Sequence, residues 1–360
     1  MNNSKKVLIS TMYTLNYGNR LQNYALTRVL SKLGYDVSTI TWKNKHGCLK
    51  HQVGSFFHRI TRYRFANTWW RKYYPLFRYF NEFDENINIM YGKNIKYEQE
   101  KFDYIVVGSD QVWNPSWNFD SDWKRYFFLT ETPDSMKIAY AASIGVDEIP
   151  LDYKAFYKES LSKFKHISVR ENRASEILRE EFNIESQTVL DPTLLLTKEE
   201  WSRVEKMPRN FDKTLENNKY ILVYSLDELG LNDEKKRFIN EIANQKGYTV
   251  VNLFSDEKIS KHVGPAEFIF LIHHAGMIVT DSFHASVFSY IFEKNFWIMK
   301  REDEEMWSRL DGFTKKFQLT NRIVDYDNYN LHQDDDSNIT FDVLKHERAR
   351  SVDFLKSALE

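Results

Sequence analysis

The chain has 360 residues and a formal net charge of −1, with 42% hydrophobic and 28% charged residues. This length exceeds one ordinary core and fits two domains, and the composition supplies enough apolar surface to fold. The balanced charge gives no global reason to expect nucleic acid, whose binders usually carry a basic excess. The single cysteine, Cys48, excludes an intrachain disulfide and points to a reducing compartment.

The first apolar run, Val7 to Ile9, is far too short for the hydrophobic region of a signal peptide. No stretch of the chain approaches the ~20 apolar residues that cross a bilayer. We therefore expect a soluble, cytoplasmic protein.

Strands and helices alternate along the first half of the chain, which predicts parallel βαβ units. The first strand leads into a loop with Gly18 and Asn19, and the helix that follows ends at Gly34. The predicted elements are, in chain order, strand 6–10, helix 21–33, and strands 35–41, 103–107, 138–144, 167–169 and 189–190.

One segment does not fit this alternation. From Lys43 to Phe80 there are nine Lys or Arg residues and no Asp or Glu, with aromatic residues throughout. One interpretation is a helical insertion whose aromatic side chains belong to the core. The other is a basic, aromatic patch that rests on an anionic membrane face, where Trp and Tyr suit the headgroup level.

The alternation restarts after a charged stretch, residues 198–219, which we interpret as the connection between domains. The architecture that this favours is two α/β domains with a cleft between them. We expect an N-terminal domain at 1–200 with an insertion at about 43–100, a C-terminal domain at 215–330, and a helical tail at 331–360. The predicted elements of the second half are strand 220–224, helix 234–246, strand 248–253, helix 267–275, strand 277–280 and helix 285–292.

The segment from Ile278 to Ala285 reads as a strand, a short polar turn and the start of a helix. Ligands of α/β sheets bind beyond the carboxyl ends of the strands, and the free amides of a helix N-terminus favour an anion. His284 is therefore a candidate for ligand binding. The alternative is a turn histidine that only caps the helix.

Several motifs together resemble the polysaccharide pyruvyl transferase family, in the family's order from about residue 5 to about residue 325. They are GNRLQNYAL (18–26), VGSDQVWNP (107–115), YAAS (140–143), SVRE (168–171), VLDPT (189–193), VGP (263–265) and DSFH (281–284). The resemblance implies two Rossmann-like domains in the manner of GT-B glycosyltransferases. It also implies transfer of pyruvate from phosphoenolpyruvate, a co-substrate, onto a sugar as a cyclic ketal, with no separate cofactor. The sequence itself shows no clear metal cluster, so we expect no metal.

The resemblance places two residues at the donor, because the matching histidine and arginine of the family contact it: His284 and Arg170. A planar guanidinium suits a carboxylate or phosphate, and an imidazole can give or take a proton near neutral pH. The alternative for Arg170 is an ion pair with Glu171 or between the domains. Ser282 stands where many members carry an arginine, and Arg301 is our candidate to supply that cation.

The N-terminal loops are expected to face the sugar acceptor. Gly18 lets the backbone approach a ligand, and Asn19 and Gln22 can hydrogen-bond hydroxyl groups, although both are also candidates for helix capping. Ser109 and Asp110 follow another strand, and Asp110 is a candidate base for an acceptor hydroxyl.

Three further residues or motifs carry simpler interpretations. Trp113 is expected in the core, with sugar stacking as the alternative, and Asp191 before Pro192 is expected to organise a turn. The pair His273-His274 is interpreted as a helix end, because no third ligand lies at a sensible spacing in the sequence.

Two other functions stay open for this chain. One is a sugar-nucleotide glycosyltransferase of the same architecture, and the other is a non-catalytic relative that binds a glycan or lipid. Pyruvyl transfer predicts a role in exopolysaccharide or capsule biosynthesis for the cell envelope. A lipid-linked acceptor would add peripheral contact with the inner membrane face.

Overall fold

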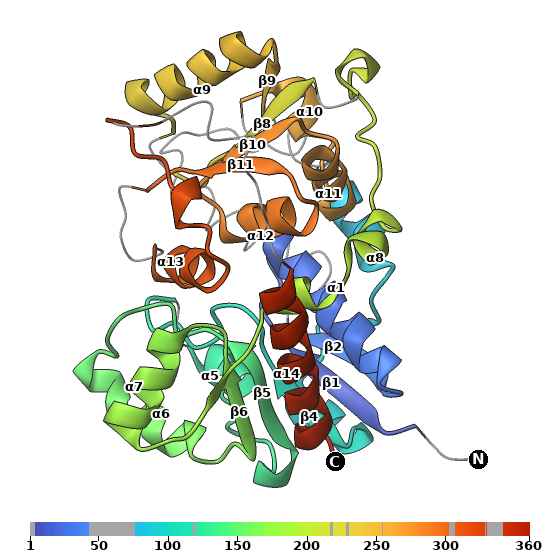
Figure 1. The fold of residues 1–360 in the computed structure, drawn as a ribbon. Helices are drawn as coiled ribbons and strands as arrows, with labels where there is room; N and C mark the ends of the chain where they lie inside the picture. Colours follow the sequence, from blue (N-terminus) through green and yellow to red (C-terminus); the bar gives the residue numbers. More distant parts are fainter. Residues whose placement is uncertain are drawn as a thin grey trace, which may run out of the picture. The chain divides into compact units, whose positions relative to one another are not determined.

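The computed structural model describes residues 4–42, 76–117, 120–216, 219–227, 230–253, 255–301, 307–327, 329 and 341–360. These residues form two compact units (Figure 1). The first unit lies within Met1–Gly54, Asp84–Leu196 and Leu344–Glu360, and the second within Ser55–Phe83 and Thr197–Val343. Cys48 and the basic, aromatic segment as far as residue 75 lie outside the described residues.

A seven-stranded parallel sheet forms the centre of the first unit, in the order β3-β2-β1-β4-β5-β6-β7. This is the strand order of the Rossmann fold, in which ligands bind where the order reverses, here between β1 and β4. The strands are β1 (Lys6–Ser10), β2 (Asp36–Thr41), β3 (Ile89–Tyr91), β4 (Tyr104–Val107), β5 (Lys137–Ala142), β6 (His166–Val169) and β7 (Gln187–Thr188).

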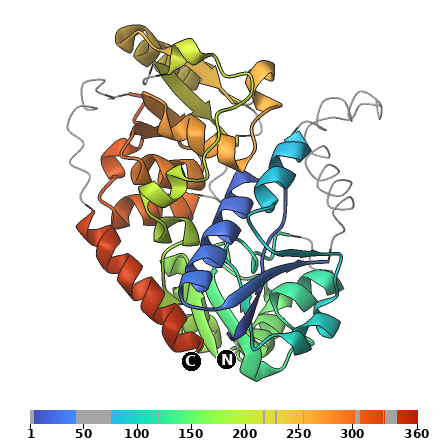
Figure 2. The same ribbon diagram turned by 90° about the vertical axis from the view of Figure 1, so that its right-hand side faces the viewer.

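Helices cover both faces of this sheet. Figures 1 and 2 show α1 and α14 on one face and α5, α6 and α7 on the other. Apolar side chains of β1, β4 and β5 pack with α6 and α7 in one core, which includes Trp113 and Tyr157. The helices are α1 (Tyr17–Lys32), α4 (Ile95–Glu98), η1 (Gln99–Lys101), α5 (Ser121–Phe127), η2 (Asp134–Met136), α6 (Leu151–Leu161), α7 (Asn172–Phe182), η3 (Pro192–Leu195) and α14 (Asp342–Ala358).

The expected C-terminal tail contributes to the first unit through α14. Arg348 donates hydrogen bonds to the carbonyl oxygens of Leu194 at 2.5 Å and Leu196 at 2.7 Å. The hydroxyl of Ser351 accepts a hydrogen bond from the backbone amide of Leu190 at 3.0 Å. The last helix is thus part of the first unit, whereas the sequence suggested a separate segment at 331–360.

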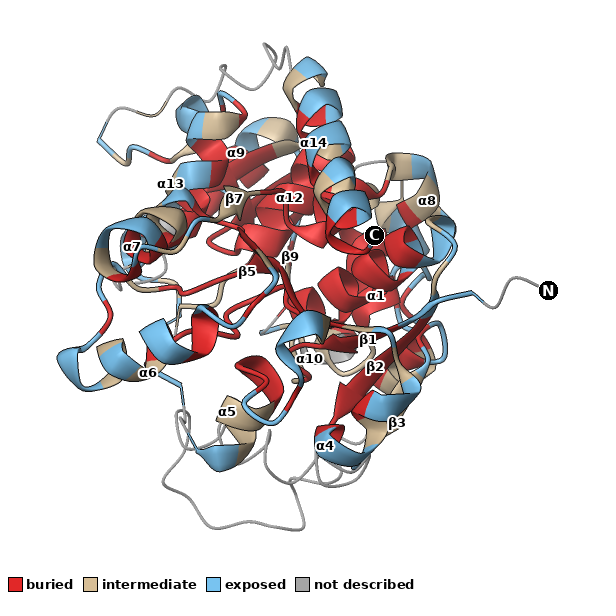
Figure 3. Ribbon diagram, turned by 90° about the horizontal axis from the view of Figure 1, so that it is seen from below, coloured by how far each residue is buried: buried red, intermediate tan, exposed pale blue. Residues whose placement is uncertain are grey.

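The second unit is built on a four-stranded parallel sheet in the order β11-β10-β8-β9. The order reverses between β8 and β10, which is the corresponding ligand position of this smaller Rossmann-like sheet. Helix α9 packs on one face through Phe238, Ile239 and Ile242. Helices α11 and α12 lie on the other, and every residue of α12 is buried (Figure 3).

The strands of this unit are β8 (Tyr220–Tyr224), β9 (Thr249–Asn252), β10 (Met277–Thr280) and β11 (Asn295–Ile298). Its helices are α8 (Lys198–Ser202), η4 (Lys213–Leu215), α9 (Asp233–Lys246), α10 (Glu257–Ser260), α11 (Pro265–His273), α12 (Phe283–Ile291), α13 (Trp307–Lys316) and η6 (Thr320–Arg322), and residues 76–84 are also helical. In the described part of the chain, no helix is both long and apolar enough to cross a bilayer.

All four predicted helices begin earlier than the sequence indicated, by one residue in α9, two residues in α11 and α12, and four residues in α1. Helix α1 starts at Tyr17 rather than Leu21, because the Asn16 side chain accepts a hydrogen bond from the amide of Asn19 at 3.3 Å. Gly18 and Asn19 therefore lie in the first helical turn and not in a loop. Helix α12 starts at Phe283, with the hydroxyl of Ser282 as its cap.

Candidate functional site

Buried polar side chains gather at the carboxyl-end edge of the first sheet. They follow β1, β4, β6 and β7 or lie in the first turns of α1. Their hydrogen bonds and ion pairs connect them into one network, which we call the Arg170 network. Its members are Thr11, Asn19, Gln22, Ser109, Asp110, Arg170, Glu171 and Asp191.

Arg170 is held by carboxylates on three sides. Its guanidinium lies 2.7 Å from Asp191, 3.5 Å from Asp110 and 3.9 Å from Glu171, and its side chain is only 3% exposed. Burial alone would lower the pKa of Arg170, but the three carboxylates outweigh it and raise the pKa above its usual value. Arg170 thus pairs closely with Asp191 of the same unit, a partner that the sequence did not suggest, whereas Glu171 lies farther away.

The charge of the Arg170 network is acidic. With all groups ionised, three carboxylates face one guanidinium, which leaves a formal excess of two negative charges. A phosphate or carboxylate ligand would be repelled here, whereas hydroxyl groups can donate hydrogen bonds to the carboxylates. The geometry argues against Arg170 as the residue that grips phosphoenolpyruvate.

Gln22 and Ser109 are buried beneath this edge and connect its loops by hydrogen bonds. Gln22 is fully buried, and its amide nitrogen donates to the hydroxyl of Thr11 at 2.8 Å while its amide oxygen accepts from the backbone of Ser109 at 3.1 Å. The Ser109 hydroxyl is also fully buried and donates to the carbonyl of Ala141 at 3.0 Å. The predicted acceptor contacts of these two side chains do not fit this burial, so we assign them to positioning.

Asp110 and Asn19, which are 6% and 5% exposed, are less completely buried than Gln22 and Ser109, so we keep them as candidates to face a ligand. The Asn19 amide donates a hydrogen bond to Asp110, whose other carboxylate oxygen accepts from the backbone of Gln111 at 2.9 Å. Asp110 has a φ of 73°, a left-handed conformation that non-glycine residues adopt mainly at turns and functional sites. Capping of α1 by Asn16 removes helix capping as an explanation for Asn19.

Gly108 lets the loop after β4 approach β5. Its φ is +110°, and a Cβ atom there would lie 2.2 Å from the carbonyl oxygen of Tyr140. Any other residue would therefore both strain the backbone and collide with the neighbouring strand.

The second sheet brings Asp281, Ser282, His284 and Arg301 to its own carboxyl-end edge. Asp281 is fully buried and accepts hydrogen bonds from the hydroxyl of Ser225 at 2.6 Å and the amide of Leu226 at 2.7 Å. It thereby joins the ends of β8 and β10 at the reversal of strand order. Arg301 follows β11, donates to the carbonyl of Asp281 at 3.2 Å and lies 3.6 Å from its carboxylate.

His284 lies in the first turn of α12 and is 8% exposed. Its ring meets the ring of Phe283 edge to face at 5.2 Å between centroids. The N-terminus of this nine-residue helix supplies a partial positive charge, and the charge of Arg301 is balanced by the buried carboxylate of Asp281. Arg301 thus contacts Asp281, the residue before Ser282, and stays our candidate for the cation that many family members carry at position 282.

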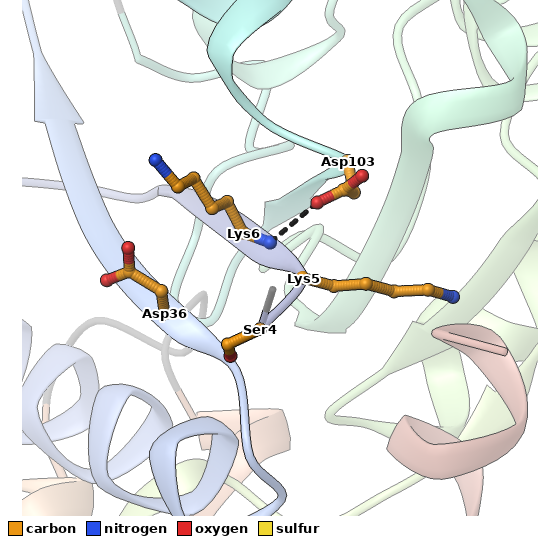
Figure 4. A pocket seen from close by; sticks show the side chains of 5 residues that line it. All are labelled: Ser4, Lys5, Lys6, Asp36 and Asp103. Atoms are coloured by element: carbon orange, nitrogen blue, oxygen red, sulfur yellow. Dashed lines mark hydrogen bonds between the residues drawn. The ribbon is translucent and has the colours of Figure 1, made fainter. Parts of the chain in front are cut away.

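An open pocket at the opposite end of the first sheet contains none of the predicted site residues. It lies at the amino ends of β1, β2 and β4, where the backbone amide of Lys6 donates to the carboxylate of Asp103 at 2.7 Å (Figure 4). Ligand sites of parallel α/β sheets lie at the carboxyl ends, so we do not assign the candidate site to this pocket. Its lining residues are Ser4, Lys5, Lys6, Asp36 and Asp103.

The remaining sequence interpretations have clear outcomes. Trp113 is fully buried and its ring nitrogen donates to the carbonyl of Phe127 at 2.8 Å, so it belongs to the core. Asp191 caps η3 by accepting from the amide of Thr193 at 3.0 Å, which confirms its turn role. The sequence analysis did not identify Asp191 as the partner of Arg170. Its position just after a strand end could have indicated that it lies at the same edge of the sheet.

Comparisons with known proteins agree with this architecture. The fold is similar to a crystal structure of UDP-GlcNAc 2-epimerase from Neisseria meningitidis (13% identity, 98% of this chain, 100% of that chain, TM-score 0.50). It is also similar to the glycotransferase of kitacinnamycin (9% identity, 99% of this chain, 98% of that chain, TM-score 0.50). These likenesses confirm an α/β protein with two Rossmann-like domains.

No curated protein sequence matches the chain. A sequence model of one family, described as polysaccharide pyruvyl transferase, matches residues 16–303. The matched range includes both carboxyl-end edges, from Gly18 and Asn19 to His284 and Arg301. The chain belongs to the polysaccharide pyruvyl transferase family.

Proposed function

We propose that this protein transfers pyruvate from phosphoenolpyruvate to two hydroxyl groups of a sugar and forms a cyclic ketal. The observation that carries the proposal is the difference in charge between the two carboxyl-end edges. The Arg170 network has an acidic excess, which suits hydroxyl groups. The edge around His284 carries no such excess, because Arg301 faces the single carboxylate of Asp281, and the N-terminus of α12 adds a partial positive charge that suits an anion.

The donor side of the proposal rests on three residues of the second unit. Phosphoenolpyruvate carries a phosphate and a carboxylate, so it needs fixed cationic and amide donors. Arg301 supplies the cation, and the first turn of α12 supplies backbone amides near the hydroxyl of Ser282. His284 lies in the same turn, and an imidazole is a common general acid or base.

The acceptor side rests on Asp110 and Asn19 in the first unit, beside the backbone of Gly18. The Asp110 carboxylate can take a proton from an acceptor hydroxyl, and Asn19 holds that carboxylate in place. Arg170 acts as a positioning residue, because its guanidinium joins Asp110 to Asp191. This role replaces the donor contact that the family resemblance implied for Arg170.

The reaction proceeds through a cation at the middle carbon of the donor. A proton is added to the methylene carbon, and the oxygen of one sugar hydroxyl then forms a bond to the middle carbon while its proton leaves to a base. The bond to the phosphate oxygen breaks and phosphate departs with the electron pair. A second hydroxyl closes the ring and loses its proton, so the net products are the ketal and inorganic phosphate. No cofactor is needed beyond phosphoenolpyruvate as co-substrate.

The deciding experiment incubates the full chain with phosphoenolpyruvate and a panel of free and lipid-linked sugars. Phosphate release together with a pyruvate-sized mass gain of the sugar supports the proposal. Transfer from a nucleotide sugar in place of phosphoenolpyruvate would support the glycosyltransferase alternative. Sugar binding without phosphate release on any member of the panel would support a non-catalytic relative.

Whether the sugar acceptor is free or lipid-linked also affects where in the cell the protein works. If only lipid-linked sugars accept pyruvate, the protein works at the inner membrane face, and the basic, aromatic segment is our candidate for the contact. Co-sedimentation with anionic liposomes, weakened by added salt, tests this part separately from turnover.

A further inference from the structure

A cluster of two histidines and a glutamate lies in the second unit, outside the residues used above. His273 is the last residue of α11 and His274 is its C-terminal cap. Glu205, 68 residues before His273, lies between α8 and η4. One carboxylate oxygen of Glu205 is 2.8 Å from Nδ1 of His273, and the other is 3.3 Å from Nε2 of His274.

Each of the three side chains offers one possible ligand atom. The ring nitrogens and the carboxylate oxygen all lie within 4.8 Å of one another. A tetrahedral zinc ion with bonds of 2.0–2.1 Å separates its ligand atoms by about 3.3 Å. The two contacts of Glu205, at 2.8 Å and 3.3 Å, are thus close to the spacing of ligand atoms around zinc.

Packing fixes both histidine rings before any ion binds. The ring of His274 stacks on Phe270 at 4.2 Å between centroids, and the ring of His273 stacks on Phe292 at 4.3 Å. The two imidazoles are 4.8 Å apart. Rings that are already oriented lose less side-chain entropy when they bind a ligand.

The cluster lies at the opposite end of β10 from His284. Helix α11 leads through Gly276 into the amino end of β10, and the amide of Gly276 donates to the carbonyl of Tyr220 at the start of β8. His284 follows the carboxyl end of β10. The cluster is therefore separate from the anion-binding edge of the same sheet.

We propose that Glu205, His273 and His274 bind a divalent transition-metal ion, with zinc as the best fit. Two imidazoles and one carboxylate are a known three-ligand set for zinc, and imidazole disfavours magnesium or calcium. The side chains are 16%, 24% and 36% exposed for Glu205, His273 and His274, so water can reach the fourth position. The ion ties the segment after α8 to the end of α11, next to the backbone hydrogen bond from Lys206 to Ala266 at 3.1 Å.

The test uses the full chain after treatment with a chelator, titrated with Zn²⁺ by calorimetry and with Co²⁺ by visible absorption. We expect one ion per chain, with binding that weakens as acid protonates the histidines. Glu205→Gln and His273→Gln should each weaken binding at least about tenfold. The matched control is His346→Gln, because His346 is an exposed histidine beside one carboxylate, Glu347 at 3.7 Å, and should leave binding unchanged.

Equal zinc affinity of the wild type and the two site variants would overturn the proposal, as would the absence of stoichiometric binding to the wild type. X-ray absorption of the zinc-loaded wild type provides a check that does not depend on the variants folding. Two imidazoles and oxygen in the first shell support the site. A shell of oxygen atoms alone would show adventitious binding and would also overturn it.

Discussion

The guanidinium of Arg170 lies 2.7 Å from the carboxylate of Asp191, and both side chains are buried at the carboxyl-end edge of the first sheet. Asp191 also caps η3 through Thr193, so one carboxylate connects a helix start to the Arg170 network. Loss of the arginine would leave Asp191, Asp110 and Glu171 close together without their shared cation. We therefore expect Arg170 to stabilise the folded state of the first unit.

The first prediction concerns the unfolding of Arg170→Ala. Removing one partner of a buried ion pair typically costs about 3–5 kcal/mol, because the other charge stays buried. We expect a loss of this size in the free energy of unfolding, measured by urea denaturation. Arg179→Ala is the control, since Arg179 is 57% exposed and pairs only at the surface with Glu180, which predicts a loss below about 1 kcal/mol. If Arg170→Ala instead kept native stability and bound phosphoenolpyruvate poorly, Arg170 would be a donor-binding residue, as the family resemblance implied.

The second prediction separates proton transfer from binding at His284. His284→Asn retains a polar side chain of similar size but cannot carry a proton at neutral pH. Loss of a general acid or base typically costs about a hundred- to ten-thousandfold in rate. We expect turnover at saturating donor to fall by this factor while the KM for phosphoenolpyruvate stays near that of the wild type. Near-native turnover would show that His284 serves only to position or cap α12.

The third prediction concerns Arg301. Arg301→Ala removes the cation beside Asp281, and a charge-assisted contact is worth about 1.5–3 kcal/mol, or roughly ten- to 150-fold in affinity. The KM for phosphoenolpyruvate should rise by a factor in this range, as measured by steady-state phosphate release. Arg301→Lys keeps the charge without the planar fork and should recover part of the affinity. An unchanged KM in both variants would assign Arg301 to holding Asp281 alone.

The fourth prediction concerns pH and Glu267, which lies in α11 and accepts a hydrogen bond from the amide of Gly264 at 2.9 Å. Burial raises the pKa of Glu267 to about 7 from a usual value of 4.5, although hydrogen bonds from the backbone oppose the shift. Between these two values the folded state holds a proton that the unfolded state has released. The contribution of Glu267 to stability therefore falls as pH rises through this window.

Glu267→Gln keeps an oxygen for the Gly264 amide and removes the buried charge. Relative to wild type, the variant should gain about 1–3 kcal/mol of unfolding free energy between about pH 5 and about pH 8. Urea denaturation at both pH values measures this difference. Glu159→Gln is the control, because the pKa of the exposed Glu159 is lowered by its hydrogen bond with Lys163 and its variant should show no such gain. A Glu267→Gln variant whose relative stability does not change with pH would contradict the prediction.

The strands at the centre of each sheet could be predicted from sequence, because buried parallel strands are continuous apolar runs between turn residues. The limits of β1, β8 and β10 match the prediction residue for residue. Edge strands β3 and β11 were not predicted: β3 has three half-buried residues and no distinct pattern. The predicted strand at 189–190 follows β7, whose two residues are Gln187 and Thr188.

The candidate site could be predicted only in part. The position of a residue just after a strand identifies Asp110, Arg170 and His284 as candidates, because strand ends meet at one edge. The sequence does not show which charged side chains form ion pairs with one another. The main partner of Arg170 is Asp191, 21 residues away along the chain. In the same way, Glu205 could not be connected to His273 and His274 without the fold.

The return of α14 to the first unit has a consequence for biosynthesis. The carbonyl groups of Leu194 and Leu196 obtain their hydrogen bonds from Arg348, which the ribosome adds long after the first sheet has been made. The first unit therefore cannot be completed during its own translation and must wait until the residues of the second unit have emerged. A nascent chain arrested before residue 344 should remain sensitive to protease in the first unit, although every strand of that unit has already been synthesised.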